Sequence, residues 1–170
     1  MSKENADKEQ KRSFKREVFS WIACIVVTIL LTEFILNFVI INANIPSGSM
    51  ENTIMTNDKL IALRTSYWFN DPKRGDIIIF KYPDDETEWF IKRVIALPGE
   101  AVLVKDGKVY INGSKKALSE PYIKEEPVED FGPYKVPKNG YFVMGDNRNN
   151  SNDAREWETH YVSRDEVLGK

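Results

Sequence analysis

Three groups of polar residues in this chain have the side chains that an amide-cleaving site needs. The stretch 46–50 reads PSGSM and could expose the hydroxyl of Ser49 in a tight turn. Lys92 lies within an apolar stretch, and the run 145–155 is dense in hydrogen-bonding side chains. A serine hydroxyl beside a lysine amine is one known arrangement for nucleophilic attack on a carbonyl carbon.

Lys92 can act as a general base only if its amine is neutral. The ordinary pKa of lysine is about 10.4, and burial among apolar groups lowers it by disfavouring the ammonium form. In an extended strand, Phe90, Lys92 and Val94 share one face, so Lys92 could be buried there. Arg93 would point to the other face and reach water or a carboxylate. The alternative, which the local sequence alone favours, is an ordinary exposed strand lysine.

His160 is the only histidine, so a Ser-His-Asp triad would have a single possible base. No motif surrounds it, and we expect a surface or packing histidine. A serine hydrolase built on this chain would therefore need another base, and lysine is a documented one.

The turn around Ser49 could also supply an oxyanion hole. The Ser49 amide and the Ser47 hydroxyl could face one point and stabilise a tetrahedral intermediate. Glu51 is expected to point away from Lys92, because a nearby carboxylate would favour the charged amine. The alternative is that the Ser-Gly-Ser string is merely a solvated loop.

The run 145–155 could frame the site. Ser151 could bond to the lysine amine and fix its direction. Four charged residues could pair among themselves and make the loop rigid: Asp146, Arg148, Asp153 and Arg155. The alternative is a polar surface loop that follows a strand.

A long apolar stretch near the N-terminus predicts a transmembrane anchor at 18–37, because a helix needs about 20 apolar residues to span a bilayer. The segment 1–17 is expected to be a basic cytoplasmic tail without regular structure. No Lys or Arg occurs between Arg16 and Lys59, so the positive-inside rule places 38–170 outside the cell. Glu33 is expected near the outer interface or protonated. The alternative is a cleaved signal peptide, although no clean small-x-small site follows.

The residues after the anchor predict a mostly β domain with antiparallel strands and no second globular domain. Asp106-Gly107 between two apolar runs is a strong hairpin signal, because this turn requires positive φ. Strands are expected near 76–80 and 141–144, and a loop or small insert at 114–138. A short helix is expected only at 164–168.

Two apolar segments of this domain, 34–45 and 67–69, have two interpretations. They could belong to the core, or they could rest on the membrane surface.

The overall composition excludes several classes of function. The net charge is −2 and no basic stripe alternates with aromatic residues, so no nucleic-acid partner is expected. The single cysteine, Cys24, has no Cys/His cluster around it, so neither a disulfide nor a metal site is predicted. No cofactor is expected.

Four segments in this order resemble the boxes of the bacterial type I signal peptidases. The segments are 46–50, 74–80, 90–100 and 145–155. Together with the anchor, the likeness covers nearly the whole chain after the tail. The resemblance implies a mostly β catalytic domain in its compact form, which contacts the lipid bilayer.

The resemblance also implies roles for the residues. Ser49 would be the nucleophile, Lys92 the general base, and Ser47 with the Ser49 amide the oxyanion hole. Ser151 would orient Lys92. Asp153 and Arg155 resemble a structural pair near the site. The substrates would be exported preproteins with small residues at positions −1 and −3.

The chain departs from the family pattern at several positions. Asn52 stands where proline is usual, and Asn149 and Ala154 replace the usual aspartate and serine; the stretch 156–161 also differs. Two alternatives stay open. One is a related Ser-Lys protease that cuts itself or a repressor, and the other is an anchored binding or assembly protein that has lost catalysis.

Overall fold

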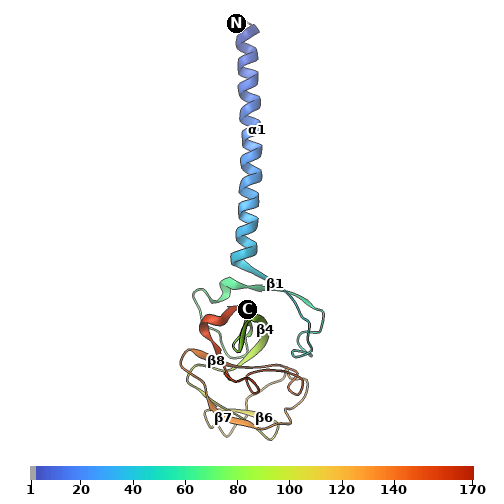
Figure 1. The fold of residues 1–170 in the computed structure, drawn as a ribbon, viewed down its shortest axis with the longest axis vertical. Coiled ribbons are helices and arrows are strands. Elements are labelled where there is room, and N and C mark those ends of the chain that lie inside the picture. Colours follow the sequence, from blue (N-terminus) through green and yellow to red (C-terminus); the bar gives the residue numbers. More distant parts are fainter. Residues whose placement is uncertain (1–2) are drawn as a thin grey trace. The chain divides into compact units, whose positions relative to one another are not determined.

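The computed structural model describes the backbone of residues 3–170 and the side chains of residues 14–170. The chain divides into two compact units at the boundary between Val39 and Ile40. The first is helical, and the second contains all the β-strands that the described residues form (Figure 1).

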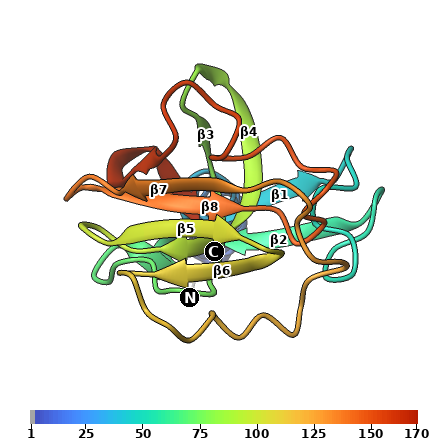
Figure 2. The ribbon, with the colours of Figure 1, turned by 90° about the horizontal axis from the view of Figure 1, so that it is seen from below.

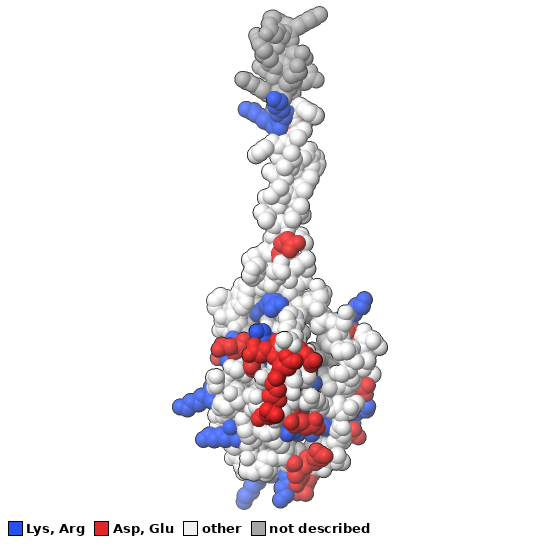
Figure 3. All heavy atoms as spheres, in the orientation of Figure 1, with Lys and Arg blue, Asp and Glu red and all other residues white. Residues whose placement is uncertain are grey.

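The first unit is one long helix, α1 (Lys3–Phe34), followed by a π-helical turn, η1 (Ile35–Val39). Within it, Phe14–Val39 is long and apolar enough to cross a membrane, and the predicted span 18–37 lies inside this stretch. No charged residue occurs between Glu17 and Glu33, and this part of α1 is white in Figure 3. Asn37 Nδ2 lies 3.1 Å from Glu33 Oε2 and donates to it, which gives this carboxylate a polar partner one turn away.

The expected tail without regular structure is wrong for residues 3–17, because α1 already begins at Lys3. This segment is rich in Glu, Lys and Arg, which are good helix formers, and it continues directly into the apolar helix. Most of its basic side chains precede Phe14 and lie outside the described residues.

The second unit is built from antiparallel strands, as predicted. The strands are β1 (Ile40–Asn44), β2 (Lys59–Leu63), β3 (Ile77–Tyr82), β4 (Asp85–Ala96), β5 (Ala101–Lys105), β6 (Lys108–Ile111), β7 (Phe131–Lys135), β8 (Gly140–Met144), β9 (Val162–Ser163) and β10 (Val167–Gly169). They form a β1-β2 pair, a five-stranded sheet in the order β10-β3-β4-β8-β9, and a three-stranded sheet in the order β6-β5-β7.

The predicted hairpin joins β5 to β6, which run side by side (Figure 2). Asp106 and Gly107 both have positive φ, of 49° and 74°, as this turn requires. The expected loop at 114–138 is wrong in part, because residues 131–135 form β7 and pair with β5. The expected helix near 164–168 is limited to a 3-10 turn at Arg164–Glu166, and the chain then extends into β10.

The main core lies between the five-stranded and the three-stranded sheets. Val94 of β4, Phe142 of β8 and Val102 of β5 are fully buried in it. The apolar stretch 67–69 is divided, because Tyr67 is buried whereas Phe69 is 91% exposed. The core therefore fixes β4 and β8 as the rigid strands from which the polar site is built.

Candidate active site

Lys92 lies in the middle of β4, opposite Ile78 of β3. Its side chain is only 4% exposed, and Nζ lies 2.8 Å from Ser49 Oγ, which is hydrogen-bonding distance. The Phe90 ring centroid is 5.3 Å from Nζ, on the face of the strand that the alternation predicted. The structure thus brings together the two residues that the sequence nominated for the chemistry.

The electrostatics of this position favour a neutral amine. Burial lowers the pKa of Lys92 to about 8, against a smaller opposing effect of the Asp153 carboxylate. Glu51 does point away, as predicted, because its Oε2 lies 2.7 Å from Lys124 Nζ. A substantial fraction of Lys92 is therefore uncharged at mildly alkaline pH.

Ser49 sits in the turn that follows β1, with 6% of its surface exposed. The next residue, Met50, is fully buried against Ile45 and Ile54 and anchors the turn in a small apolar cluster. Ser47 Oγ lies 3.4 Å from Ser49 Oγ. The two hydroxyls therefore share one small space, as an oxyanion site of the expected kind needs.

The loop after β8 holds the backbone of this turn. The N–H of Asn147 donates to Ser49 O (3.0 Å), and its Nδ2 donates to Gly48 O (2.9 Å). Sequence reasoning gave Asn147 no role of its own, and only its place in the polar run 145–155 pointed to it. Its two bonds fix the two peptide units that flank the Ser49 Cα, and the first of these units carries the Ser49 N–H.

Gly145 lets this loop approach the Ser49 turn closely. A Cβ at this position would overlap the carbonyl oxygen of Ser49 and the side chain of Ser151. Glycine is therefore required here for its lack of a side chain, because the Ser49 carbonyl oxygen belongs to the backbone and cannot rotate away as a side chain could.

Gly145→Ala is expected to lower kcat/KM for a peptide substrate by about 100-fold, since a displacement of the Ser49 turn by about 1 Å is enough for such a loss. Overpacking should also cost about 1–3 kcal/mol of unfolding free energy. Steady-state kinetics and thermal unfolding of the variant measure the two effects. Wild-type kinetics in the variant would contradict this account of the packing.

Ser151 is buried, but its Oγ has no hydrogen-bond partner within the described part of the chain. The expected bond from Ser151 to the Lys92 amine is therefore not formed in this structure. The Lys92 amine instead points to Ser49 Oγ, and Ser151 packs against Gly145.

Asp153 and Arg155 form the expected pair. Arg155 Nε donates to Asp153 Oδ1 (2.8 Å), and Arg155 Nη2 donates to Asp153 Oδ2 (3.0 Å). The same carboxylate accepts the N–H of Gly145 (2.9 Å), and Arg155 Nη2 also donates to Arg148 O (2.6 Å). The pair therefore ties together both ends of the loop 145–155.

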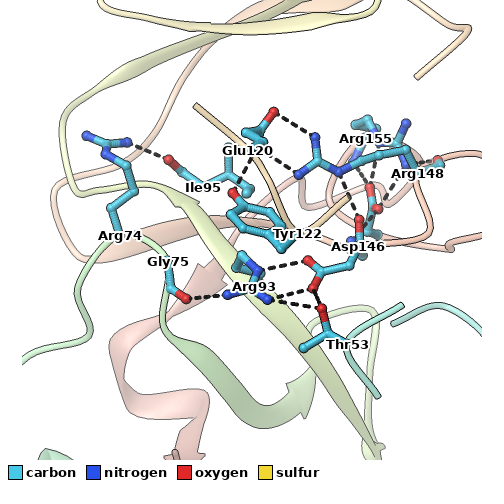
Figure 4. Close-up of polar contacts among 12 residues, drawn as sticks. Thr53, Arg74, Gly75, Arg93, Ile95, Glu120, Tyr122, Asp146, Arg148 and Arg155 are labelled. Atoms are coloured by element: carbon cyan, nitrogen blue, oxygen red, sulfur yellow. Dashed lines mark hydrogen bonds and ion pairs between the residues drawn. The ribbon is translucent and has the colours of Figure 1, made fainter. Parts of the chain in front are cut away.

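The expectation that Asp146 and Arg148 also pair within this group is wrong. Arg93 Nε donates to Asp146 Oδ1 (2.8 Å) and Arg93 Nη2 to Asp146 Oδ2 (2.6 Å), so Arg93 reaches a carboxylate as expected of the opposite face of β4 (Figure 4). Thr53 Oγ1 donates to the same carboxylate. Arg148 makes a two-bond pair with Glu120 instead (3.0 and 2.8 Å). Thr53 and Glu120 carry no signal in the sequence.

His160 has the packing role expected of it. Its Nδ1 lies 2.8 Å from Ala154 O, and its ring meets Phe131 and Tyr134 edge-on. Among the described residues, no group of three or more His, Cys, Asp or Glu side chains could hold a metal ion.

A cavity of about 560 Å³ opens on the Ser49–Lys92 pair. Its walls combine apolar and polar residues, namely Ile45, Pro46, Ser47, Gly48, Glu88, Trp89, Phe90, Ile91, Asn150 and Asn152. A concave site in which apolar walls surround convergent polar groups is typical of a substrate pocket.

The family described as "Signal peptidase, peptidase S26" matches residues 18–170. The chain belongs to this family. It is 44% identical over 150 residues to "Probable signal peptidase I-2" of Synechocystis sp., covering 85% of this chain and 67% of that protein. It is 37% identical over 157 residues to "Signal peptidase I" of Bacillus amyloliquefaciens, covering 86% and 82%.

A crystal structure of a signal peptidase I from Enterococcus faecalis V583 has a similar fold. Its TM-score is 0.51 at 36% sequence identity, and the match covers 59% of this chain and 96% of that one. The signal peptidase fold agrees with the expected mostly β domain. These comparisons do not favour either alternative, the self-cleaving protease or the inactive binding protein. The apolar helix α1 fits membrane anchoring of a signal peptidase.

Proposed function

We propose that this chain is a membrane-anchored serine endopeptidase that removes signal peptides from exported preproteins, with Ser49 as nucleophile and Lys92 as general base. The observation that carries the assignment of residues is the buried contact of 2.8 Å between Lys92 Nζ and Ser49 Oγ. Membership of the signal peptidase family supports the reaction and the class of substrate.

In the mechanism, neutral Lys92 accepts the Ser49 proton while Oγ attacks the scissile carbonyl carbon. The Ser49 amide and the Ser47 hydroxyl stabilise the oxyanion. The lysinium then protonates the leaving amine. Lys92 next deprotonates a water molecule, which attacks the acyl carbonyl carbon, and the lysinium returns this proton to Ser49 Oγ as the acyl bond breaks.

The cavity supports the choice of substrate. It places apolar walls beside Ser49, and the family resemblance implies small side chains at positions −1 and −3 of the preprotein. Asp146, Arg148, Asp153 and Arg155 have a structural role in this proposal, and Ser151 packs beside Gly145.

The rate should depend on pH through Lys92. Burial lowers its pKa to about 8, and only the neutral amine accepts a proton. Below pH 8 we therefore expect kcat/KM to fall by about tenfold per pH unit, because the neutral fraction falls in that proportion. Above pH 8 the rate should level off. A flat profile between pH 6 and 10 would contradict the role of Lys92.

The direct test of the function uses the full-length protein in detergent with a preprotein that has alanine at positions −1 and −3. We expect one cut after the alanine at −1, identified by the mass of the released mature protein. An intact preprotein after prolonged incubation at pH 9 would overturn the proposed function.

The orientation in the membrane is part of the proposal. The basic residues before the apolar stretch favour a cytoplasmic N-terminus and place residues 38–170 outside the cell. Protease added to spheroplasts should then degrade this domain, whereas survival of the domain would indicate the opposite orientation.

A further inference from the structure

The long connection between β6 and β7 contains a segment, residues 120–128, that we call the strap. It has no helix or strand, and Figure 2 shows the connection as an irregular run of backbone. Most of its residues are at least partly exposed. The strap nevertheless bonds to three elements of the site, and the mechanism above gives it no role.

The first element is the turn that carries Ser49. Asn52 Nδ2 donates to Tyr122 O (3.1 Å), and Lys124 Nζ lies 2.7 Å from Glu51 Oε2. Asn52 has φ of +85°, a left-handed conformation that asparagine tolerates. Both contacts are made within three residues of Ser49.

The second element is the loop 145–149, in which Asn147 forms hydrogen bonds to the backbone around Ser49. Glu120 pairs with the fully buried Arg148, whose Nε donates to Gly145 O (2.9 Å). Both polar atoms of the Asn149 side-chain amide bond to the strap. Oδ1 accepts from Val128 N, and Nδ2 donates to Glu126 O (3.0 Å each). The Lys124 N–H also donates to Asp146 O (3.1 Å), so the strap is bonded to this loop at three points.

The third element is β4, next to Lys92. The Tyr122 ring lies over the guanidinium of Arg93, with the ring centroid 3.9 Å from Cζ, and the Tyr122 hydroxyl donates to Glu120 (3.0 Å). Figure 4 shows Tyr122 between the Arg93–Asp146 pair and the Glu120–Arg148 pair. The same strap thus contacts both the strand that holds the base and the turn that holds the nucleophile.

We propose that the strap is a positioning element, and that Asn52 is the residue through which it holds the Ser49 turn at bonding distance from Lys92. The inference rests on the proposed function, because the distance matters only if these side chains react. A single side-chain hydrogen bond stabilises a fold by only about 1 kcal/mol. A displacement of about 1 Å between reacting groups can lower a rate by 100-fold. Loss of the Asn52 bond should therefore affect the rate far more than the stability.

The test compares Asn52→Gly with Asn112→Gly in the full-length protein. Both asparagines have a left-handed backbone conformation, with φ of 85° and 53°, so replacement by glycine removes the side chain without backbone strain. Each makes one bond between its side chain and the backbone, since Asn112 Oδ1 accepts from Ala101 N (2.8 Å). Asn112 follows β6 and bonds to the start of β5, outside the site, so Asn112→Gly is a control that also removes one hydrogen bond between an asparagine side chain and the backbone.

We expect both variants to lower the melting temperature by a similar, small amount. Asn52→Gly should lower kcat for preprotein cleavage roughly tenfold with KM close to the wild-type value. Asn112→Gly should leave kcat unchanged. Asn149→Ala, which removes an exposed side chain at the other attachment, should also lower kcat and carries the test if Asn52→Gly does not fold.

Equal kcat values for the two glycine variants, or a change in KM alone, would overturn the role of the strap. These results leave the proposed function intact, because the wild-type protein is then active. A wild-type protein that does not cut the preprotein would overturn both proposals.

Discussion

Ser49→Ala and Lys92→Met are each expected to abolish preprotein cleavage, with kcat lowered by roughly 10⁴-fold or more. Alanine removes the attacking oxygen, and methionine fills the space of the buried lysine stem without supplying a base. In the proposed mechanism the two residues act on one proton, so the double variant should be no slower than either single variant. Single-turnover cleavage assays with the full-length enzyme in excess measure these rates.

The fold should survive both changes. Ser49 and Lys92 are buried beside each other, and both replacements are uncharged and no larger than the residue that they replace. Melting temperatures near the wild-type value would show that the loss concerns chemistry alone. If folded Lys92→Met retained more than about 1% of the activity, another group would have to serve as the base.

Asp146→Ala is expected to have the largest effect on stability, at about 3–5 kcal/mol of unfolding free energy. The Asp146 carboxylate is fully buried and accepts two bonds from Arg93. Without it, the Arg93 guanidinium would remain in a mostly buried position with no carboxylate partner, and this desolvated charge causes the loss. The melting temperature should fall by roughly 10 °C, at about 2–4 °C per kcal/mol for a chain of this size.

Glu86→Ala provides the matched control, because it also breaks an ion pair. The Lys81–Glu86 pair is exposed, with Nζ and Oε2 3.3 Å apart, and such pairs contribute at most about 1 kcal/mol. Its melting temperature should stay close to that of the wild type. If Asp146→Ala and Glu86→Ala had the same melting temperature, the buried Arg93–Asp146 pair would not be what holds the loop 145–155 to β4.

The fold could be predicted, and Ser49 and Lys92 could be chosen as candidates, because both depend on local patterns and on motif order. Alternation placed Phe90 and Lys92 on one face of a strand, and Asp106-Gly107 predicted a hairpin that the positive φ values confirm. The apolar run before residue 40 predicted the helix. Each of these features is a property of neighbouring residues, so their spacing in the sequence carries it.

The partners of the charged residues could not be predicted, because they depend on which distant segments the fold brings together. Asp146 and Arg148 are two residues apart and were expected to pair within their own loop. Arg93 and Glu120 instead meet them from β4 and from the strap. An ion pair leaves no periodic signal, and any of several carboxylates could have satisfied either arginine.

The amino-acid sequence by itself determined the membrane helix, the antiparallel strands and the family, and it nominated Ser49 and Lys92. Only the tertiary structure decided that Lys92 is buried and lies 2.8 Å from Ser49, and that the strap and the loop 145–149 form hydrogen bonds to the Ser49 turn. The physical reason is that desolvation and interatomic distance arise from the packing of segments far apart in the chain. Residue types alone specify neither of them.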